Sequence, residues 1–120
     1  MTIQNFRQLN AWKESHKLVI LIYRLTDKFP SKENFTLISQ LRRCVISISS
    51  NIAEGFSRQG KKEKIQFYFT SKGSLTELEN QIIIAKEVGY TSENEYNRII
   101  NQIEIVGRLL TGLTKSLRNR

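Results

Sequence analysis

The stretch SQLRRCVISISSNIAEGFSRQGKKEK, residues 39–64, decides how this chain folds. Apolar residues in it and just before it recur every three or four positions, which is the period of one face of an α-helix. These residues are Leu37, Leu41, Cys44, Ile48, Ile52 and Phe56. A second stripe of the same helix is small and polar, and consists of Ser47, Ser50, Asn51 and Glu54. Because both faces need a neighbour, the stretch predicts a central helix packed against two others.

The central helix is expected to span residues 36–55, with Thr36 or Asn34 as its N-cap. Gly55 is predicted to end it, since glycine most easily adopts the left-handed conformation of a helix C-terminus. A basic turn follows, and its charged residues are Arg58, Lys61, Lys62, Glu63 and Lys64. Taken alone, such a cluster is typical of a solvated turn.

The first helix is predicted to span residues 11–28, with Asn10 as its N-cap and Pro30 just beyond its end. Trp12 flanks its apolar face, where we expect it to pack. The core positions of this face are Ala11, Leu18, Ile22, Leu25 and Phe29. Because the connection to the central helix is short, the two helices should be antiparallel.

The third helix is predicted to span residues 61–87, between Gly60 and Gly89. Its expected buried residues are Ile65, Tyr68, Phe69, Leu75, Leu78, Ile82 and Ala85. Gly73 lies in mid-helix, where glycine costs about 0.5–1 kcal/mol relative to alanine. We therefore expect Gly73 to allow close approach to the small stripe of the central helix, with a merely tolerated glycine as the alternative.

The fourth helix is predicted to span residues 92–117, because Ser92 and Glu95 have the spacing of a capping box. Its apolar stripe alternates steps of three and four without a break, through Tyr96, Ile99, Ile103, Val106, Leu110, Leu113 and Leu117. Further apolar residues lie off this stripe, namely Ile100, Ile105 and Leu109. This additional apolar surface favours contact with another subunit.

Helices joined by short loops predict an all-α fold, an antiparallel up-down-up-down four-helix bundle that forms one domain over residues 1–120. The longest apolar run, residues 18–23, is too short to cross a bilayer, and the N-terminus lacks a signal pattern. With a single cysteine, these features favour a cytoplasmic protein without a membrane partner.

Net charge is the global property that points to a partner. The chain holds 19 Lys and Arg against 11 Asp and Glu, a net charge of +8. Such an excess suits a nucleic acid surface or serves solubility. Since the excess is spread along the sequence, any clustering must come from the fold.

Residue types that carry catalysis are poorly represented. Cys44 lies on an apolar stripe and is expected to be buried, while His16 lacks partners at metal-ligand spacing. Glu54 is expected to form an ion pair with Arg42, Arg43 or Arg58, which is a structural role. We therefore predict a protein that is not an enzyme and needs no metal or cofactor.

Motifs across the first three helices resemble the four-helix-bundle proteins encoded by intervening sequences within bacterial 23S ribosomal RNA genes. The matching segments are QLRR at residues 40–43, SNIAEG at 50–55, KKE at 61–63, GSLTEL at 73–78 and AKEVGY at 85–90. The matching single residues are Phe6, Leu9, Trp12, Tyr23, Leu25, Thr26, Phe29 and Pro30. The fourth helix matches in pattern only. This family is related in fold to the accessory variability protein of diversity-generating retroelements.

Two departures from the family pattern affect helix shape. The family often has SIPSN where residues 47–51 read SISSN, so a proline kink is softer here. It often has serine before KKE, where this chain has Gly60, which is itself a permitted N-cap. Neither departure changes the expected fold.

The resemblance implies a homopentameric ring, association with RNA or a nucleic-acid-processing protein, and no known enzymatic activity. Two functions therefore remain: a sequence-nonspecific RNA- or DNA-binding module, or a protein interaction scaffold whose charge serves solubility. The up-down topology gathers scattered cations at one end of the bundle. The predicted nucleic-acid-binding residues are Arg7, Lys13, Arg58, Lys61, Lys62, Lys64, Lys115, Arg118 and Arg120. Structural or interface roles are predicted for Trp12, Arg42, Arg43, Ser50, Asn51, Glu54, Gly55 and Gly73.

Overall fold

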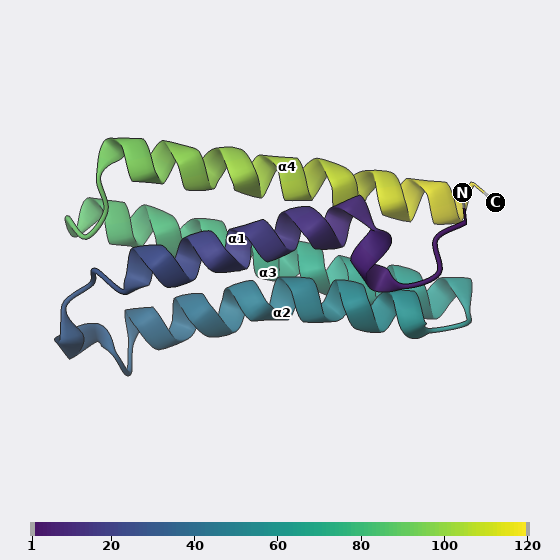
Figure 1. Cartoon of the computed structure of the whole chain (residues 1–120), viewed down its shortest axis with the longest axis horizontal. Helices are drawn as coiled ribbons and strands as arrows, with labels where there is room; N and C mark the ends of the chain where they lie inside the picture. The colour runs from purple at the N-terminus through teal and green to yellow at the C-terminus, as the bar shows by residue number, and fades with distance from the viewer. Residues whose placement is uncertain (1, 120) are drawn as a thin grey trace.

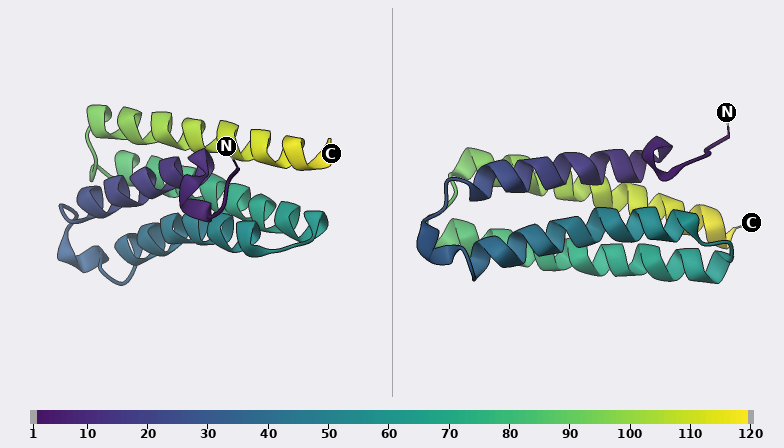
Figure 2. Two further views of the ribbon diagram at one scale, coloured as in Figure 1. Left: turned by 45° about the vertical axis from the view of Figure 1, so that its right-hand side comes forward. Right: turned by 60° about the horizontal axis from the view of Figure 1, so that its bottom comes forward.

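Four long helices account for most of the chain in the computed structural model, which describes residues 2–119 (Figure 1). The elements in order are η1 (Phe6–Gln8), α1 (Asn10–Thr26), η2 (Ser31–Glu33), α2 (Leu37–Ser57), α3 (Lys61–Glu87) and α4 (Glu93–Arg118). Consecutive helices run antiparallel, and α1 and α3 each pack against both α2 and α4 (Figure 2). The predicted antiparallel four-helix bundle is confirmed.

The core runs along the bundle axis and draws on all four helices. Most predicted positions are confirmed, and fully buried examples are Leu18, Ile22, Leu41, Ile48, Ile52, Leu78, Ile82, Val106 and Leu110. Phe69 was expected in the core but is 38% exposed, so that prediction is wrong. The face of α3 is turned so that Ser71 and Gln81, rather than Phe69, are buried.

Helix starts and ends follow the sequence signals only in part. Ser92 and Glu95 form the predicted capping box, and Gly89 has a left-handed φ of 91°. Asn10 is not the N-cap of α1, because the helix already includes it and Leu9 occupies the cap position without a side-chain bond. Thr36 occupies the N-cap position of α2, but its hydroxyl donates to Glu33 instead of capping the helix.

Gly55 does not end α2, in contrast to the prediction. The helix continues to Ser57, and Gly55 is buried within it. A Cβ atom at this position would lie 2.8 Å from Tyr68 Cε1 and 2.9 Å from Phe67 Cβ. Both distances are shorter than real Cβ contacts, so glycine is required here because α3 approaches the backbone of α2.

The close approach predicted for Gly73 is wrong, although α2 and α3 do pair closely. Gly73 is exposed, and a Cβ atom there would meet nothing within 4 Å. Small polar side chains occupy the contact instead. Ser71 Oγ donates to Ile48 O at 2.8 Å, and the hydroxyls of Ser47 and Ser74 lie 2.9 Å apart.

Other members of the small stripe of α2 have local or exposed roles. Asn51 Nδ2 donates to Ser47 O at 2.8 Å, within its own helix. Ser50 and Glu54 are exposed, so they do not belong to the contact with α3. The second face of α2 is therefore narrower than its sequence pattern indicated.

Two glycine substitutions test this assignment of the close contact. Gly73→Ala should raise the free energy of unfolding by about 0.5–1 kcal/mol, because alanine is the better helix former and no neighbour obstructs it. Gly55→Ala should lower it by about 1–3 kcal/mol, because the methyl group overpacks against Tyr68 and Phe67. Urea unfolding followed by circular dichroism measures both. If Gly55→Ala is as stable as the parent protein, the contact is not close enough to require glycine.

Candidate nucleic-acid interface

The topology places the start of α1, the α2–α3 turn and the end of α4 at one end of the bundle, on the right in Figure 1. We call this end the basic pole. Its described cations are Arg7, Lys13, Arg58, Lys61, Lys62, Lys64, Lys115 and Arg118. Arg120, also predicted for this site, lies outside the described residues. The structure therefore brings these eight described residues to one end from three separate parts of the chain.

Cations at the α2–α3 turn stack on phenylalanine rings. Arg58 Cζ lies 4.9 Å from the ring centroid of Phe67, a normal cation–π distance. Lys64 Nζ lies 5.1 Å from the ring of Phe56 and donates to Phe56 O at 2.6 Å. Lys64 thus satisfies a carbonyl of the last turn of α2, which is a structural role. Lys61 and Lys62 are exposed at the start of α3.

The remaining cations of the basic pole come from the two chain ends. Arg118, at the end of α4, lies with Cζ 5.0 Å from the ring of Phe69. Lys115 is exposed one turn earlier, and Lys13 is exposed on the first turn of α1. Arg7 Cζ lies 5.7 Å from the ring of Phe6. Glu54 and Glu63 are the acidic residues nearest in sequence to the turn, so cations outnumber acids at this end.

At the opposite end of the bundle, which we call the far pole, three cations form ion pairs. Arg42 pairs with Asp27 at 2.8 Å, Lys86 with Glu93 at 2.9 Å, and Lys28 with Glu95. The hydrogen bond from Lys28 holds the pKa of Glu95 below its usual value. Each cation named here therefore has a carboxylate beside it, and two of them, Arg42 and Lys86, also lie over the rings of Tyr23 and Tyr96.

A further hydrogen bond joins the two loops of the far pole. Tyr90 donates to Glu33 Oε2 at 2.8 Å, linking the chain after α3 to η2. Hydrogen bonds from Thr36 and Tyr90 hold the pKa of Glu33 below its usual value. The hydrogen bond between Tyr90 and Glu33 also raises the pKa of Tyr90. The far pole is thus cross-linked by a hydrogen bond as well as by ion pairs.

Arg42 has a structural role, as predicted, but its partners differ from the predicted ones. Arg42 was expected near Glu54, but it stacks on Tyr23 at 4.5 Å and bonds Thr26 as well as Asp27. Arg43 and Glu54 are both exposed. Glu54 was predicted to pair with Arg42, Arg43 or Arg58, and the ion pairs among residues 2–119 include none of these, so that prediction is wrong.

Trp12 packs at the edge of α1, as expected. Its ring meets Phe6 edge-on at a centroid distance of 5.3 Å. His16 stacks on the same ring at 4.9 Å and is exposed to solvent. This aromatic cluster fixes η1 against the first turns of α1.

Residues able to support catalysis or metal binding are scarce in the described part of the chain. Burial raises the pKa of the Cys44 thiol to about 12, so the thiol is protonated at neutral pH and is a poor nucleophile. Between residues 2 and 119 no group of three or more His, Cys, Asp or Glu side chains is placed to hold a metal ion. Within the same residues, none of the helices has the length and apolar character needed to cross a membrane.

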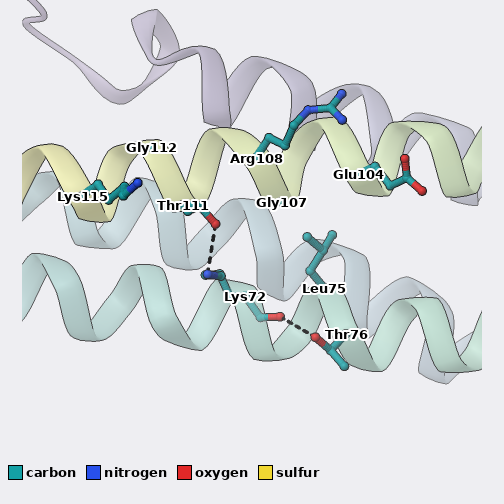
Figure 3. A pocket seen from close by; sticks show the side chains of 9 residues that line it. All are labelled: Lys72, Leu75, Thr76, Glu104, Gly107, Arg108, Thr111, Gly112 and Lys115. Carbon is teal, nitrogen blue, oxygen red and sulfur yellow. Dashed lines mark hydrogen bonds between the residues drawn. The ribbon is translucent and has the colours of Figure 1, made fainter.

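An open groove of about 760 Å³ between α3 and α4 was not predicted from the sequence (Figure 3). Its lining residues are Lys72, Leu75, Thr76, Glu104, Gly107, Arg108, Thr111, Gly112 and Lys115. Lys115 connects this groove to the basic pole. Arg108 and Lys115 are seven residues apart on α4, a spacing that could have indicated a shared face.

Comparison with known proteins supports the fold and the family. A solved structure, a protein of unknown function from the S23 ribosomal protein family of Bacteroides thetaiotaomicron, superposes with a TM-score of 0.81. The match covers 88% of this chain and 95% of the other at 21% sequence identity, so it concerns the fold alone. No curated protein sequence matches the chain. The family model described as 23S rRNA-intervening sequence protein matches residues 7–112, and the chain belongs to that family.

Proposed function

We propose that this protein binds nucleic acid without sequence preference through the basic pole. The unequal neutralisation of the two poles is the observation that carries this proposal. At the far pole Arg42, Lys28 and Lys86 each face a carboxylate, whereas at the basic pole Arg58 and Arg118 lie over phenylalanine rings. A ring orients a cation without cancelling its charge, so these guanidinium groups keep their charge available to a phosphate.

RNA is the partner that the family description favours. The matched family takes its description from intervening sequences of 23S ribosomal RNA. Contacts from Lys and Arg to phosphates are independent of base sequence, and they suit a pole built from separated cations rather than from a shaped base-reading pocket. Binding of RNA and DNA with similar affinity follows from this mode of recognition.

Self-association would place several copies of the basic pole in one assembly. Several apolar residues off the core stripe remain partly accessible on the single chain, among them Ile100, Ile105 and Leu109 of α4. We propose that these side chains are covered in a homo-oligomer, with five subunits as implied by the family resemblance. A ring of parallel subunits repeats the basic pole around one rim, which turns weak individual phosphate contacts into avid binding.

A scaffold for protein interaction is the second candidate, and one observation at the far pole favours it. Phe35, in the connection before α2, is 96% exposed, and Val88, at the end of α3, is 56% exposed. Exposed apolar side chains beside a neutral surface are typical of a protein contact site. This function requires no nucleic acid, so binding measurements separate the two candidates.

Assembly is tested by light scattering at micromolar concentration. The expected mass is a small multiple of the 14.0 kDa chain, with five copies as the leading value. Ile105→Glu should reduce the mass without loss of helicity, because a carboxylate cannot be buried unpaired between subunits. Asn101→Glu, at an exposed position on the same helix, is the matched control. A monomeric parent protein would remove the proposed ring.

Nucleic acid binding is tested by fluorescence anisotropy over a range of salt concentrations. Contact with about five phosphates gives a slope of log affinity against log salt of roughly −3.5 to −4.5. Lys61→Ala combined with Lys62→Ala should make the slope shallower by about 1.4–1.8, because two contacts are removed. Lys64 is left in place because it bonds Phe56 O.

The matched control replaces two exposed cations outside the basic pole, Arg24→Ala with Lys32→Ala, and should leave the slope unchanged. Absence of binding to single-stranded and duplex RNA and DNA at low salt would reject the proposed function and leave the scaffold as the better account. An equal loss in the control pair would show that net charge, rather than the basic pole, drives binding.

A further inference from the structure

Two glycines of α4, Gly107 and Gly112, line the groove between α3 and α4 (Figure 3). A Cβ atom at Gly107 would lie 3.5 Å from Leu75 Cδ2, which is ordinary contact, and one at Gly112 would meet nothing within 4 Å. The space beside Gly112 could therefore hold a side chain, but the glycine leaves it empty. The backbone of α4 is therefore open to a ligand at Gly112. Glycine within a helix lowers the stability of that helix.

Positive charge predominates along this groove. Lys72, Arg108 and Lys115 line it, and Glu104 is the acidic residue among the lining side chains. Lys72 extends across the groove from α3, with Nζ donating to Thr111 Oγ1 at 3.1 Å. Arg108 turns away from α3 and lies on the α1 side of α4 (Figure 3). A negatively charged ligand would thus meet Lys72 inside the groove and Arg108 at its edge.

An aromatic residue that the core does not use lies one turn before Lys72 on α3, toward the basic pole. Lys62, Phe69 and Thr76 follow one another at intervals of seven on α3, so they share one side of that helix. Phe69 is 38% exposed, and the guanidinium of Arg118 lies over its ring at 5.0 Å. Rings and guanidinium planes are the surfaces on which unpaired bases stack.

We infer that the α3–α4 groove binds one unpaired strand of nucleic acid, with phosphates at Lys72 and Lys115 and a base stacked on the Phe69–Arg118 pair. Axes of packed helices lie about 8–10 Å apart, so the groove between them suits a single strand rather than a duplex. A helix from a second copy fits less well, because a chain of net charge +8 would meet a groove whose lining is itself positive. This inference rests on the proposed function and adds the path and the strandedness of the ligand.

Phe69→Leu tests the stacking contact, because leucine keeps apolar volume but has no π-face. Its affinity for a fluorescent 20-nucleotide oligo(U) or oligo(dT) should fall on the order of tenfold, while its affinity for a 20-base-pair duplex stays the same. Circular dichroism and light scattering confirm that fold and assembly are unchanged. An equal effect on single strands and duplexes, or none on either, would overturn the stacking contact.

Lys72→Ala and Gly112→Glu test the path of the strand. Lys72→Ala should make the single-strand salt slope shallower by about 0.7, the share of one phosphate. Gly112→Glu introduces a carboxylate where no atom obstructs it, and should abolish single-strand binding at moderate salt. Gly112→Ala, which adds no charge, and Lys32→Ala, at the far pole, are the controls and should bind like the parent protein.

The outcomes separate this inference from the proposed function. If the parent protein binds and the Lys61/Lys62 variant is weakened while Lys72→Ala and Gly112→Glu are not, the groove is rejected and the basic pole stands. If the parent protein binds none of the four nucleic acids, both are rejected. RNA and DNA probes together decide whether the 2′-hydroxyl contributes, since a groove that reads phosphates and stacked bases should bind both.

Discussion

The close contact between Gly55 and Tyr68 is the constraint on which the rest of the structure depends. Tyr68 is 1% exposed and fills the space that a side chain at position 55 would occupy. Serine hydroxyls continue the contact along α2 and α3, where larger side chains would hold the helices apart. Because α2 and α3 are held together up to their shared turn, the turn is short and its cations are presented at the end of the bundle.

Electrostatic asymmetry follows from this arrangement. The far pole contains the connections α1–α2 and α3–α4, and acidic residues there neutralise Lys28, Arg42 and Lys86. At the α2–α3 turn, Arg58 lies over the ring of Phe67 and Lys64 over the ring of Phe56. The same fold thus gives one end three cations with carboxylate partners, and the other end two arginines that lie over phenylalanine rings.

Much of this architecture could be predicted from the sequence. The apolar stripes of α1, α2 and α4, the Ser92–Glu95 capping box and the left-handed Gly89 follow local rules of periodicity and capping. Gathering of the cations at one pole followed from the up-down topology alone. These features depend on chain order and on local conformation, both of which are written in the sequence.

The roles of individual glycines could not be predicted in this way. Gly55 and Gly73 both lie within helices, and their sequence contexts do not reveal which one faces another helix at close range. That difference depends on the rotation of α2 and α3 about their axes, which also exposes Phe69 and buries Gln81. The α3–α4 groove escaped prediction for the same reason, because it is formed by two helices whose relative rotation the pattern leaves open.

Photo-crosslinking of the assembled protein to single-stranded RNA containing 4-thiouridine tests the central claim, that the basic pole and its adjoining groove form the binding surface. Mass spectrometry of the crosslinked peptides should place the RNA on residues 58–72 and 108–118, at the basic pole and its adjoining groove. Crosslinks concentrated on residues 28–36 and 86–95, at the neutralised far pole, or spread evenly over the helices, would contradict it.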